Sequence, residues 1–501
     1  MTDKTMRIAD RIPAVFITVV AAFIAMWFFV MKDGIRMFTS DGYIIDCALN
    51  IIRHGRIALS INGDMYRFNE FWLEYPPLFS IMVALTFKLF GVGYAAAKAF
   101  PFGCMIATLF VVFLFASRYT SRTMAGLITG LIAFDPLFFD HAMRIRPDCL
   151  TTLLFSTSVF LFFVNLEKKS LPIAVVTGAT AGLAALTHFN MVWIMIIFGL
   201  YALLSLRDFK RMFAVHAVHT ATFFVIIAPY ALWILLNPEL RSLFVTQVFL
   251  NTYLAKHPSM HFSYLKMALN PLANFYLILV QYKSFYPLVF AASSLYCLRH
   301  YRTHKYLLLA LAVPFMMTMF NFRAAHYLLP TMGVCYAALA FYFPRRAEKE
   351  KAAALSRAGL ALLAFIIAAS VAVDLNRMRI DRGMLMDREY FTKVLEENTK
   401  PDSRIATEIN LILCESGGRK VVNVGALIYD VWRIYYSFDD VARAIDPDYI
   451  VLTENKMKWA RTEHPQIKEF NAFLDGKFEF VKKVEDGRHS TLWIYKRKGI
   501  A

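Results

Sequence analysis

Apolar runs of membrane-spanning length recur along the first three quarters of the chain. A helix needs about 20 apolar residues to cross the hydrocarbon core of a bilayer, and eleven segments reach or approach that length. The eighth segment is short, and an earlier start through 271–282 is an alternative. The pattern predicts a polytopic α-helical membrane protein with about eleven transmembrane helices. The segments are 12–31, 95–117, 123–141, 148–166, 171–188, 189–206, 212–236, 284–298, 306–322, 327–343 and 354–374.

Lysine and arginine gather in every second connection between these runs. Such basic loops face the cytoplasm in membrane proteins, which predicts a cytoplasmic N-terminus. The alternation holds if the apolar stretch 77–93 does not cross the membrane but lies as a helix in the outer interface, with Lys88 reaching toward water. A second interfacial helix is predicted over 44–54, where apolar residues recur at helical spacing. Residues 32–94 then form the first outer loop.

The pattern changes after residue 375. Two amphipathic segments, 385–398 and 464–475, are typical of helices, and short apolar or alternating runs indicate strands. We expect residues 1–374 to form the transmembrane domain and 375–501 to form a small soluble α/β domain. An odd number of spans places this second domain on the periplasmic side. The predicted strands are 403–409, 419–424, 448–453 and a hairpin over 477–496.

Composition agrees with a membrane protein. Hydrophobic residues make up 58% of the 501 residues, charged residues only 18%, and the mean hydropathy is +0.48. The net charge of +17 comes from loops and the C-terminal third without a basic stripe, so nucleic-acid binding is not predicted. The sequence lacks a P-loop, a GxGxxG after a strand, HExxH and GxSxG. The six cysteines are scattered, and a bridge between Cys47 and Cys414 is an open possibility.

The first outer loop is polar and rich in carboxylates although it lies between apolar runs. Asp41 follows the first span closely, where a carboxylate is costly unless it faces water or a cavity. One interpretation is a general base, because a low-dielectric wall brings the pKa of a carboxyl toward the working range. The alternative is a helix cap, with Ser40 or Asp41 capping a helix that begins at Tyr43. Glu74, just before a Pro-Pro pair, is either functional or simply solvated.

Two arginines stand on the predicted outer side, where basic residues are uncommon. Arg144 and Arg146 belong to the segment RIRPD, which ends at Asp148. Guanidinium groups hold phosphate through bidentate, charge-assisted hydrogen bonds, so this pair predicts an anion-binding site. The alternatives are internal salt bridges with Asp140 or Asp148, or an N-cap by Asp148. Arg323 occupies a similar outer position.

The histidines do not form a metal-binding pattern. His188 ends the fifth predicted span, and a packed or hydrogen-bonded side chain is its ordinary interpretation. His257 and His261 have near-helical spacing, but a proline lies between them. His216 and His219 lie inside the seventh span and are expected in its core. No metal site and no cofactor are predicted.

The order and spacing of several short motifs resemble the GT-C superfamily of membrane glycosyltransferases. The similarity is to the branch that contains protein O-mannosyltransferases and lipid A aminoarabinose transferases, and it covers roughly residues 10–345. The Pro-Pro pair and the first-loop aspartate are its most characteristic parts. The matching features are Asp41, EYPPL at 74–78, LFG at 89–91, RIRPD at 144–148, GLAALTHF at 182–189 and RAAHYLLP at 323–330.

The resemblance implies an inverting transfer from a polyprenyl-phosphate-sugar donor to a hydroxyl of an envelope glycan, lipid or protein, on the periplasmic face of a bacterial inner membrane. A transporter or flippase for lipid-linked glycans is the alternative, and would have charged residues inside several spans and paired half-helices. A non-catalytic assembly protein is a third possibility. By the resemblance, the general base is Asp41, the other acidic residues of the active site are Glu74 and Asp148, and the donor-phosphate-binding residues are Arg144, Arg146, His188 and Arg323.

Overall fold

The structure is a computed structural model of the 501-residue chain. It describes residues 13–31, 35–36, 39–62, 65–204, 209–250, 264–300, 328–342, 365–373, 376, 385–386, 388–428, 437–454, 456–457, 465–485 and 491–500.

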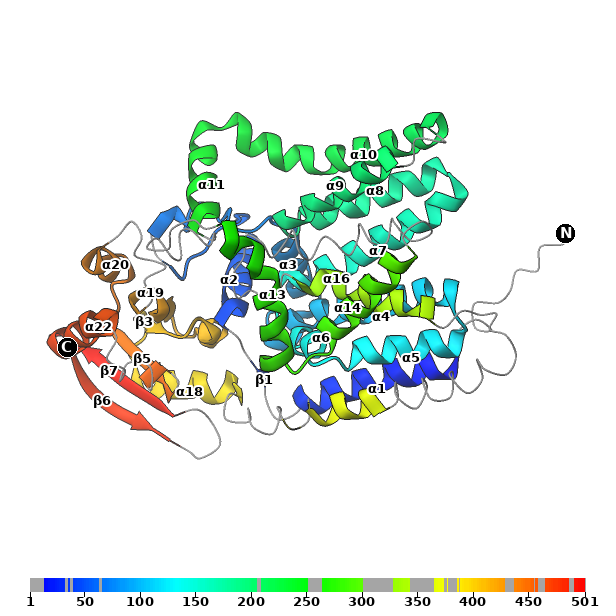
Figure 1. The fold of residues 1–501 in the computed structure, drawn as a ribbon. Coiled ribbons are helices and arrows are strands. Elements are labelled where there is room, and N and C mark those ends of the chain that lie inside the picture. Colours follow the sequence, from blue (N-terminus) through cyan, green and yellow to red (C-terminus); the bar gives the residue numbers. More distant parts are fainter. Residues whose placement is uncertain are drawn as a thin grey trace.

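Apolar helices packed side by side form the larger part of the molecule (Figure 1). α10 packs along α8, α8 along α7, and α7 along α4, while α5 lies between α4 and α1. α16 packs against α4, α5 and α7. The helices are α1 (Ala14–Met31), α4 (Tyr94–Tyr119), α5 (Arg122–Ala133), α6 (Pro136–Ala142), α7 (Pro147–Lys168), α8 (Leu171–Ala185), α9 (Trp193–Leu204), α10 (Phe209–Leu236), α11 (Pro238–Leu250), α13 (Tyr264–Gln281), α14 (Tyr286–Arg299) and α16 (Leu329–Ala338).

Three described helices are long and apolar enough to cross a membrane by themselves. They are α4, α7 and the part of α10 from Phe213 to Leu236, and the bent pair α5–α6 makes a fourth. The predicted spans agree with observed helices wherever the structure describes them. The segment 306–322 lies outside the described residues, as does most of 354–374. The number of eleven crossings, and their orientation, therefore stay predictions.

A buried aspartate lies at the 69° bend between α5 and α6. Asp135 caps α6, because its Oδ1 accepts the Leu137 amide at 2.9 Å, and Pro136 supplies the first helical residue. Its Oδ2 accepts the Tyr336 hydroxyl at 2.6 Å and the Ser284 hydroxyl at 2.9 Å. Asp135 thus joins the bend to α16 and to the start of α14, and both of its carboxylate oxygens have partners.

The first outer loop folds into helices that cover one end of the bundle. α2 (Thr39–His54) packs against α3 (Leu78–Phe90), and α3 packs against α4. Both helices were predicted, and their place in the membrane interface stays a prediction, but the predicted start of the first is wrong. α2 begins at Thr39, so Asp41 lies in its first turn and is not a cap for a helix from Tyr43. Short helix η2 (Met65–Arg67) and an extended segment connect the two helices.

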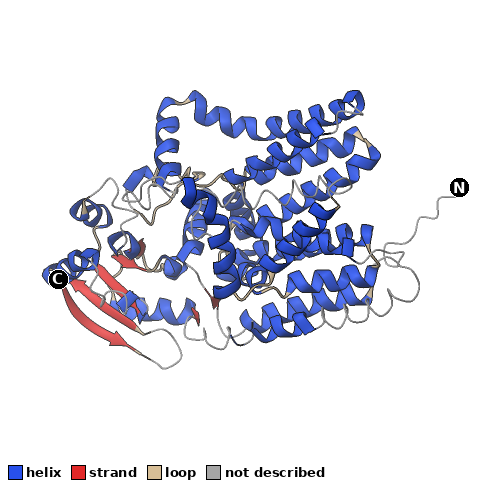
Figure 2. Ribbon diagram, in the orientation of Figure 1, coloured by secondary structure: helices blue, strands red, loops and turns tan. Residues whose placement is uncertain are grey.

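A five-stranded sheet stands at one end of the molecule, away from most of the bundle (Figure 2). Its order is β4-β3-β5-β7-β6, with β3 parallel to β4 and β5, and β7 antiparallel to β5 and β6. Each predicted strand is present within a few residues, including the hairpin. The strands are β3 (Arg404–Thr407), β4 (Lys420–Asn423), β5 (Tyr449–Thr453), β6 (Phe478–Val484) and β7 (Leu492–Arg497), and the accompanying helices are α18 (Arg388–Asn398), η8 (Ile409–Cys414), α19 (Val424–Ile428), α20 (Phe438–Ile445) and α22 (Pro465–Lys477).

An asparagine at the end of β4 joins the sheet to the first outer loop. The Asn423 amide donates to the Ile61 carbonyl at 2.9 Å, and its side chain donates to the Tyr43 hydroxyl at 2.9 Å and to Asn62 Oδ1 at 3.1 Å. β1 (Ile35–Arg36) also pairs with β2 (Leu385–Met386). The C-terminal sheet therefore buttresses α2. Cys47 and Cys414 are both free and buried, so the possible disulfide between them does not form.

Gly178 lies where α8 packs closely against α10. A Cβ at this position would lie 2.3 Å from the His219 carbonyl oxygen, whereas a Cβ at Gly199 of α9 would have no neighbour within 4 Å. Because the obstacle is backbone, we expect Gly178→Ala to destabilise the bundle by about 1–3 kcal/mol. Gly199→Ala is the matched control and should leave the thermal midpoint in detergent unchanged or slightly raised. Equal midpoints for the two variants would contradict this close helix crossing.

Candidate active site

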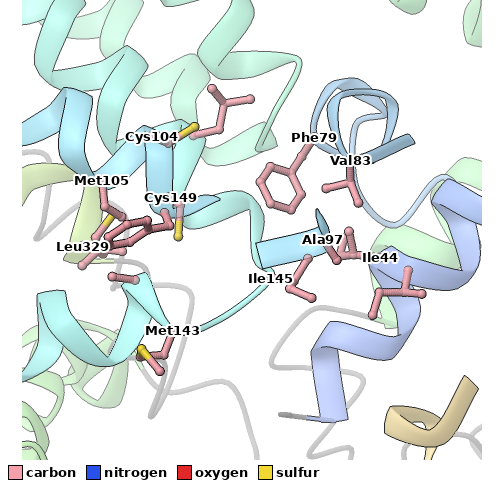
Figure 3. Packing of buried hydrophobic residues seen from close by; sticks show 14 of the residues in the cluster. Ile44, Phe79, Val83, Ala97, Cys104, Met105, Met143, Ile145, Cys149 and Leu329 are labelled. Carbon is pink, nitrogen blue, oxygen red and sulfur yellow. The ribbon is translucent and has the colours of Figure 1, made fainter. Parts of the chain in front are cut away.

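Asp41 lies where α2, α4 and the connection between α6 and α7 meet. Its side chain is fully buried, and its Oδ1 accepts the backbone amide of Ile145 at 3.0 Å. Its place in the first turn of α2 also puts the carboxylate at the positive end of the helix dipole. Figure 3 shows Ile145 near Ala97 of α4 and Ile44 of α2. The carboxylate of the first loop is therefore bonded to the backbone of the RIRPD segment, at the residue between the two arginines in the sequence.

Lys98 forms an ion pair with Asp41, and it was not among the site residues predicted from the sequence. It lies on the second turn of α4, is fully buried, and has its Nζ 3.8 Å from Asp41 Oδ2. The same Nζ donates a hydrogen bond to the Met143 carbonyl. The available signal was a lysine inside an otherwise apolar run, because ionisable residues at membrane depth are functional candidates.

Arg144 and Arg146 each form an ion pair with a neighbouring aspartate. Arg144 pairs with Asp140 at 2.6 Å, and Arg146 Nε donates to Asp148 Oδ2 at 2.8 Å. The internal salt bridges considered from the sequence are thus present, while Asp148 lies in the first turn of α7 and does not cap it. The arginine side chains remain 15% and 13% exposed, against 6% and 3% for the aspartates.

The Glu74 segment docks on the end of α8 beside His188. The Leu78 amide donates to the Leu186 carbonyl at 3.2 Å, and the rings of Tyr75 and His188 meet edge to face at 5.7 Å. Glu74 Oε2 accepts the indole N–H of Trp72 at 3.3 Å. The half-buried Glu74 side chain therefore accepts a hydrogen bond from a residue of its own loop.

His188 is a packed and hydrogen-bonded residue, as its ordinary interpretation predicted. Its Nδ1 accepts the Asn190 amide at 3.3 Å, which leaves the neutral ring with its proton on Nε2. It lies within electrostatic range of Arg146 and Asp148. The His188 and RIRPD motifs are therefore near each other in space.

Arg323 and a metal site are the two remaining points of the sequence-based predictions. Arg323 lies outside the described residues, so its relation to the site stays a prediction. In the part of the chain that the structure describes, no group of three or more His, Cys, Asp or Glu side chains is arranged to hold a metal ion.

A second buried carboxylate, Asp46, lies one helical turn further along α2. Its Oδ2 accepts the amides of Ser60 at 2.6 Å and Ile61 at 3.1 Å, and its Oδ1 accepts the Ser60 hydroxyl at 2.8 Å. Burial raises the pKa of Asp46 from 3.8 to about 7, although the hydrogen bonds from Ser60 and Ile61 act in the opposite direction. Glu415 of the C-terminal part raises it further.

The arrangement combines a buried carboxylate, a lysine 3.8 Å from it, and a connection that carries two arginines. Asp41 can accept a proton, while Arg144 and Arg146, at their partly exposed edges, can donate hydrogen bonds to an anion. The hydrogen bond from Ile145 joins the carboxylate to the arginine-bearing segment, because Ile145 lies between the two arginines in the sequence. Such a site suits a reaction in which a hydroxyl loses its proton and an anionic group departs.

Comparison with sequence families gives a match to part of the chain. The sequence model of the family described as dolichyl-phosphate-mannose-protein mannosyltransferase matches residues 74–233. A protein of Aquifex aeolicus without an assigned function is 21% identical over 155 residues. That match covers 31% of this chain and 30% of the length of that relative.

Comparison with solved structures extends the similarity to nearly the whole chain. The structure of ArnT from Cupriavidus metallidurans with undecaprenyl phosphate superimposes with a TM-score of 0.61 at 13% identity, over 97% of this chain and 98% of that one. The archaeal oligosaccharyltransferase AglB from Archaeoglobus fulgidus, in complex with an inhibitory peptide and a dolichol-phosphate, gives 0.58 at 12% identity, over 97% and 74%. The expected GT-C fold is thus confirmed.

Asp46 predicts a pH dependence of stability. Its raised pKa means that the folded chain holds this proton more tightly than the unfolded chain, so the stabilisation is complete below about pH 4 and is lost as the pH rises through about 7. The full change corresponds to about 4 kcal/mol. Asp46→Asn removes the ionisation, so its thermal midpoint minus that of the wild type should increase between about pH 5 and about pH 8.

Asp440→Asn is the control for this measurement. Asp440 is exposed at a helix start, and hydrogen bonds from Ser437 lower its pKa, so its contribution is already complete above about pH 4. The midpoint difference for this variant should not change over the same pH range. A constant difference for Asp46→Asn as well would show that its ionisation is not linked to folding.

Proposed function

We propose that this chain, which has the fold of the GT-C glycosyltransferases, transfers a sugar from a polyprenyl-phosphate donor to a hydroxyl group at the periplasmic side of a bacterial inner membrane. The observation that carries the proposal is the hydrogen bond from the Ile145 amide to Asp41. It joins a buried carboxylate to the segment that carries two arginines, and such a transfer needs a base and a cation for the leaving group. The acceptor is an envelope glycan, lipid or protein.

The proposed reaction is a single inverting displacement. Asp41 takes the proton of the acceptor hydroxyl, the acceptor oxygen bonds to the anomeric carbon, and the bond from that carbon to the phosphate oxygen breaks with its electron pair on the phosphate. The lipid phosphate is a good leaving group, so the step needs no general acid. Arg144 and Arg146 stabilise the charge that develops on it. Glu74 belongs to the 72–78 segment, which packs against His188 through the Tyr75 ring.

Comparisons with other proteins support a lipid-linked donor. The ArnT structure contains undecaprenyl phosphate and the AglB structure contains a dolichol-phosphate. A lipid phosphate also accounts for a site at the end of apolar helices, because its tail lies in the bilayer while its head reaches polar groups. The transporter alternative would have charged residues and broken helices within the membrane, and the buried Asp135 lies at the broken α5–α6 pair. Its oxygens already accept hydrogen bonds from Tyr336, Ser284 and Leu137, so Asp135 gives this alternative little support.

Asp41→Asn is the direct test of the catalytic base. The amide keeps the shape and can still accept from Ile145, but it cannot take a proton, so turnover should fall by at least about 100-fold. Transfer is measured with purified protein in lipid and a panel of polyprenyl-phosphate sugars, and by mass analysis of envelope glycolipids from cells with and without the chain. Wild-type protein should add a single-sugar mass that the variant does not.

Glu70→Gln is the matched control, because Glu70 lies in the same loop in an exposed ion pair with Arg67. This variant should keep wild-type turnover. Full turnover in Asp41→Asn would remove Asp41 from the mechanism, and envelope glycolipids unchanged by loss of the chain would argue against the transferase.

Arg146→Ala tests the anion site. Loss of a charge-assisted contact to the donor phosphate should raise the donor KM by about tenfold or more, with a smaller change in kcat. Arg146→Lys keeps the charge without the planar fork and should give an intermediate KM. The control is Arg118→Ala, in the last turn of α4. This change breaks an ion pair with Glu167 and should not change the donor KM. An unchanged KM in Arg146→Ala would contradict donor binding there.

A further inference from the structure

Lys98 is a buried charge whose place in the molecule the proposed reaction does not yet explain. It lies on α4, one of the helices with the length and composition of a membrane span, and its side chain is fully buried. Burying an ammonium group is costly unless it is paired and hydrogen-bonded. The position therefore requires compensating groups, and those groups belong to the candidate active site.

The contacts of Lys98 and Asp41 close a ring across three chain segments. Lys98 Nζ donates to the Met143 carbonyl and lies 3.8 Å from Asp41 Oδ2, while Asp41 Oδ1 accepts the Ile145 amide at 3.0 Å. Met143 and Ile145 are two residues apart, with Arg144 between them. The connection that carries the arginines is thus held at one point by the lysine and at the other by the aspartate.

We propose that Lys98 is a positioning residue that keeps Asp41 in its ionised form and fixes it against the arginine-bearing connection. This inference rests on the proposed function, because it assigns to Lys98 the support of the catalytic base. A general base must be ionised before the acceptor arrives. A buried carboxylate favours its protonated form, and an opposite charge within about 4–6 Å reverses that preference.

The other charged groups near Asp41 already have partners of their own. Arg144 pairs with Asp140 and Arg146 with Asp148, on the α6–α7 connection and the helices that flank it. The remaining titratable groups there are the His141 imidazole and the Cys149 thiol. On α4, the charged group next to Asp41 is Lys98. Removing the lysine charge therefore leaves Asp41 beside two arginines whose charge is balanced by other carboxylates.

The test compares the pH dependence of kcat/KM in Lys98→Met and Lys98→Arg. Lys98→Met keeps the length and apolar character of the side chain and removes the charge. In this variant the acidic limb of the profile of kcat/KM against pH should move to higher pH by about one to three units. Activity should therefore fall by about tenfold or more at acidic pH and recover as the pH is raised. Lys98→Arg should keep the acidic limb near its wild-type position, whatever its rate.

A purely structural role would give a different result. Loss of packing alone lowers kcat/KM by the same factor at every pH and leaves the limb in place, and this outcome would overturn the inference. The matched control is Lys88→Met, which removes an exposed lysine from α3 and should leave the pH profile unchanged. Thermal midpoints of all variants establish that each is folded at the pH values used.

Infrared spectroscopy gives a readout that does not need activity. Lys98→Met should show an additional protonated-carboxyl stretching band at neutral pH, beyond the signal that Asp46 already gives in the wild type, and this additional band should disappear in the double variant Lys98→Met/Asp41→Asn. If the wild-type protein transfers no sugar but this band appears, the proposed function fails while the effect of Lys98 on Asp41 stands. If sugar transfer is observed but neither the band nor the pH shift appears, Lys98 does not have this role.

Discussion

The hydrogen bond between the Asp41 carboxylate and the Ile145 amide is the contact on which the rest of the site depends. Both partners are buried, so each would lose much of its solvation without the other. The first loop, α4 and the α6–α7 connection must therefore come together at this point, and Lys98 adds a cation to the same junction. A folded junction of this kind is preorganised, since its dipoles and charges are oriented before any ligand binds.

The C-terminal sheet extends this constraint to the other side of α2. Asn423 joins β4 to Tyr43 and to Ile61, while Asp46 ties α2 to the same stretch of loop. Asp41 and Asp46 lie five residues apart in one helix, so movement of α2 would disturb both sets of contacts. The sheet and the first loop thus form one structural unit around the site, rather than two parts connected by a linker.

Local patterns in the chain predicted the elements well and the details of single contacts poorly. Apolar length located α4, α7 and α10, and alternation located the strands of the C-terminal sheet, because both depend on neighbours close in sequence. The helix cap assigned to Asp41 was wrong, since its actual partner lies 104 residues away. Lys98 was missed for the same reason: its partners are on α2 and before α7.

The sequence by itself determined that this is a membrane protein with a small C-terminal sheet, and it identified Asp41, Arg144 and Arg146 as candidates, because hydropathy and residue chemistry are properties of short segments. Only the tertiary structure decided that Asp41 bonds to the backbone of the arginine-bearing segment and lies beside Lys98, that each arginine has its own aspartate, and that the sheet buttresses α2. These facts depend on which buried polar groups meet across distant segments, and burial makes such pairing obligatory without specifying the partner in the local sequence.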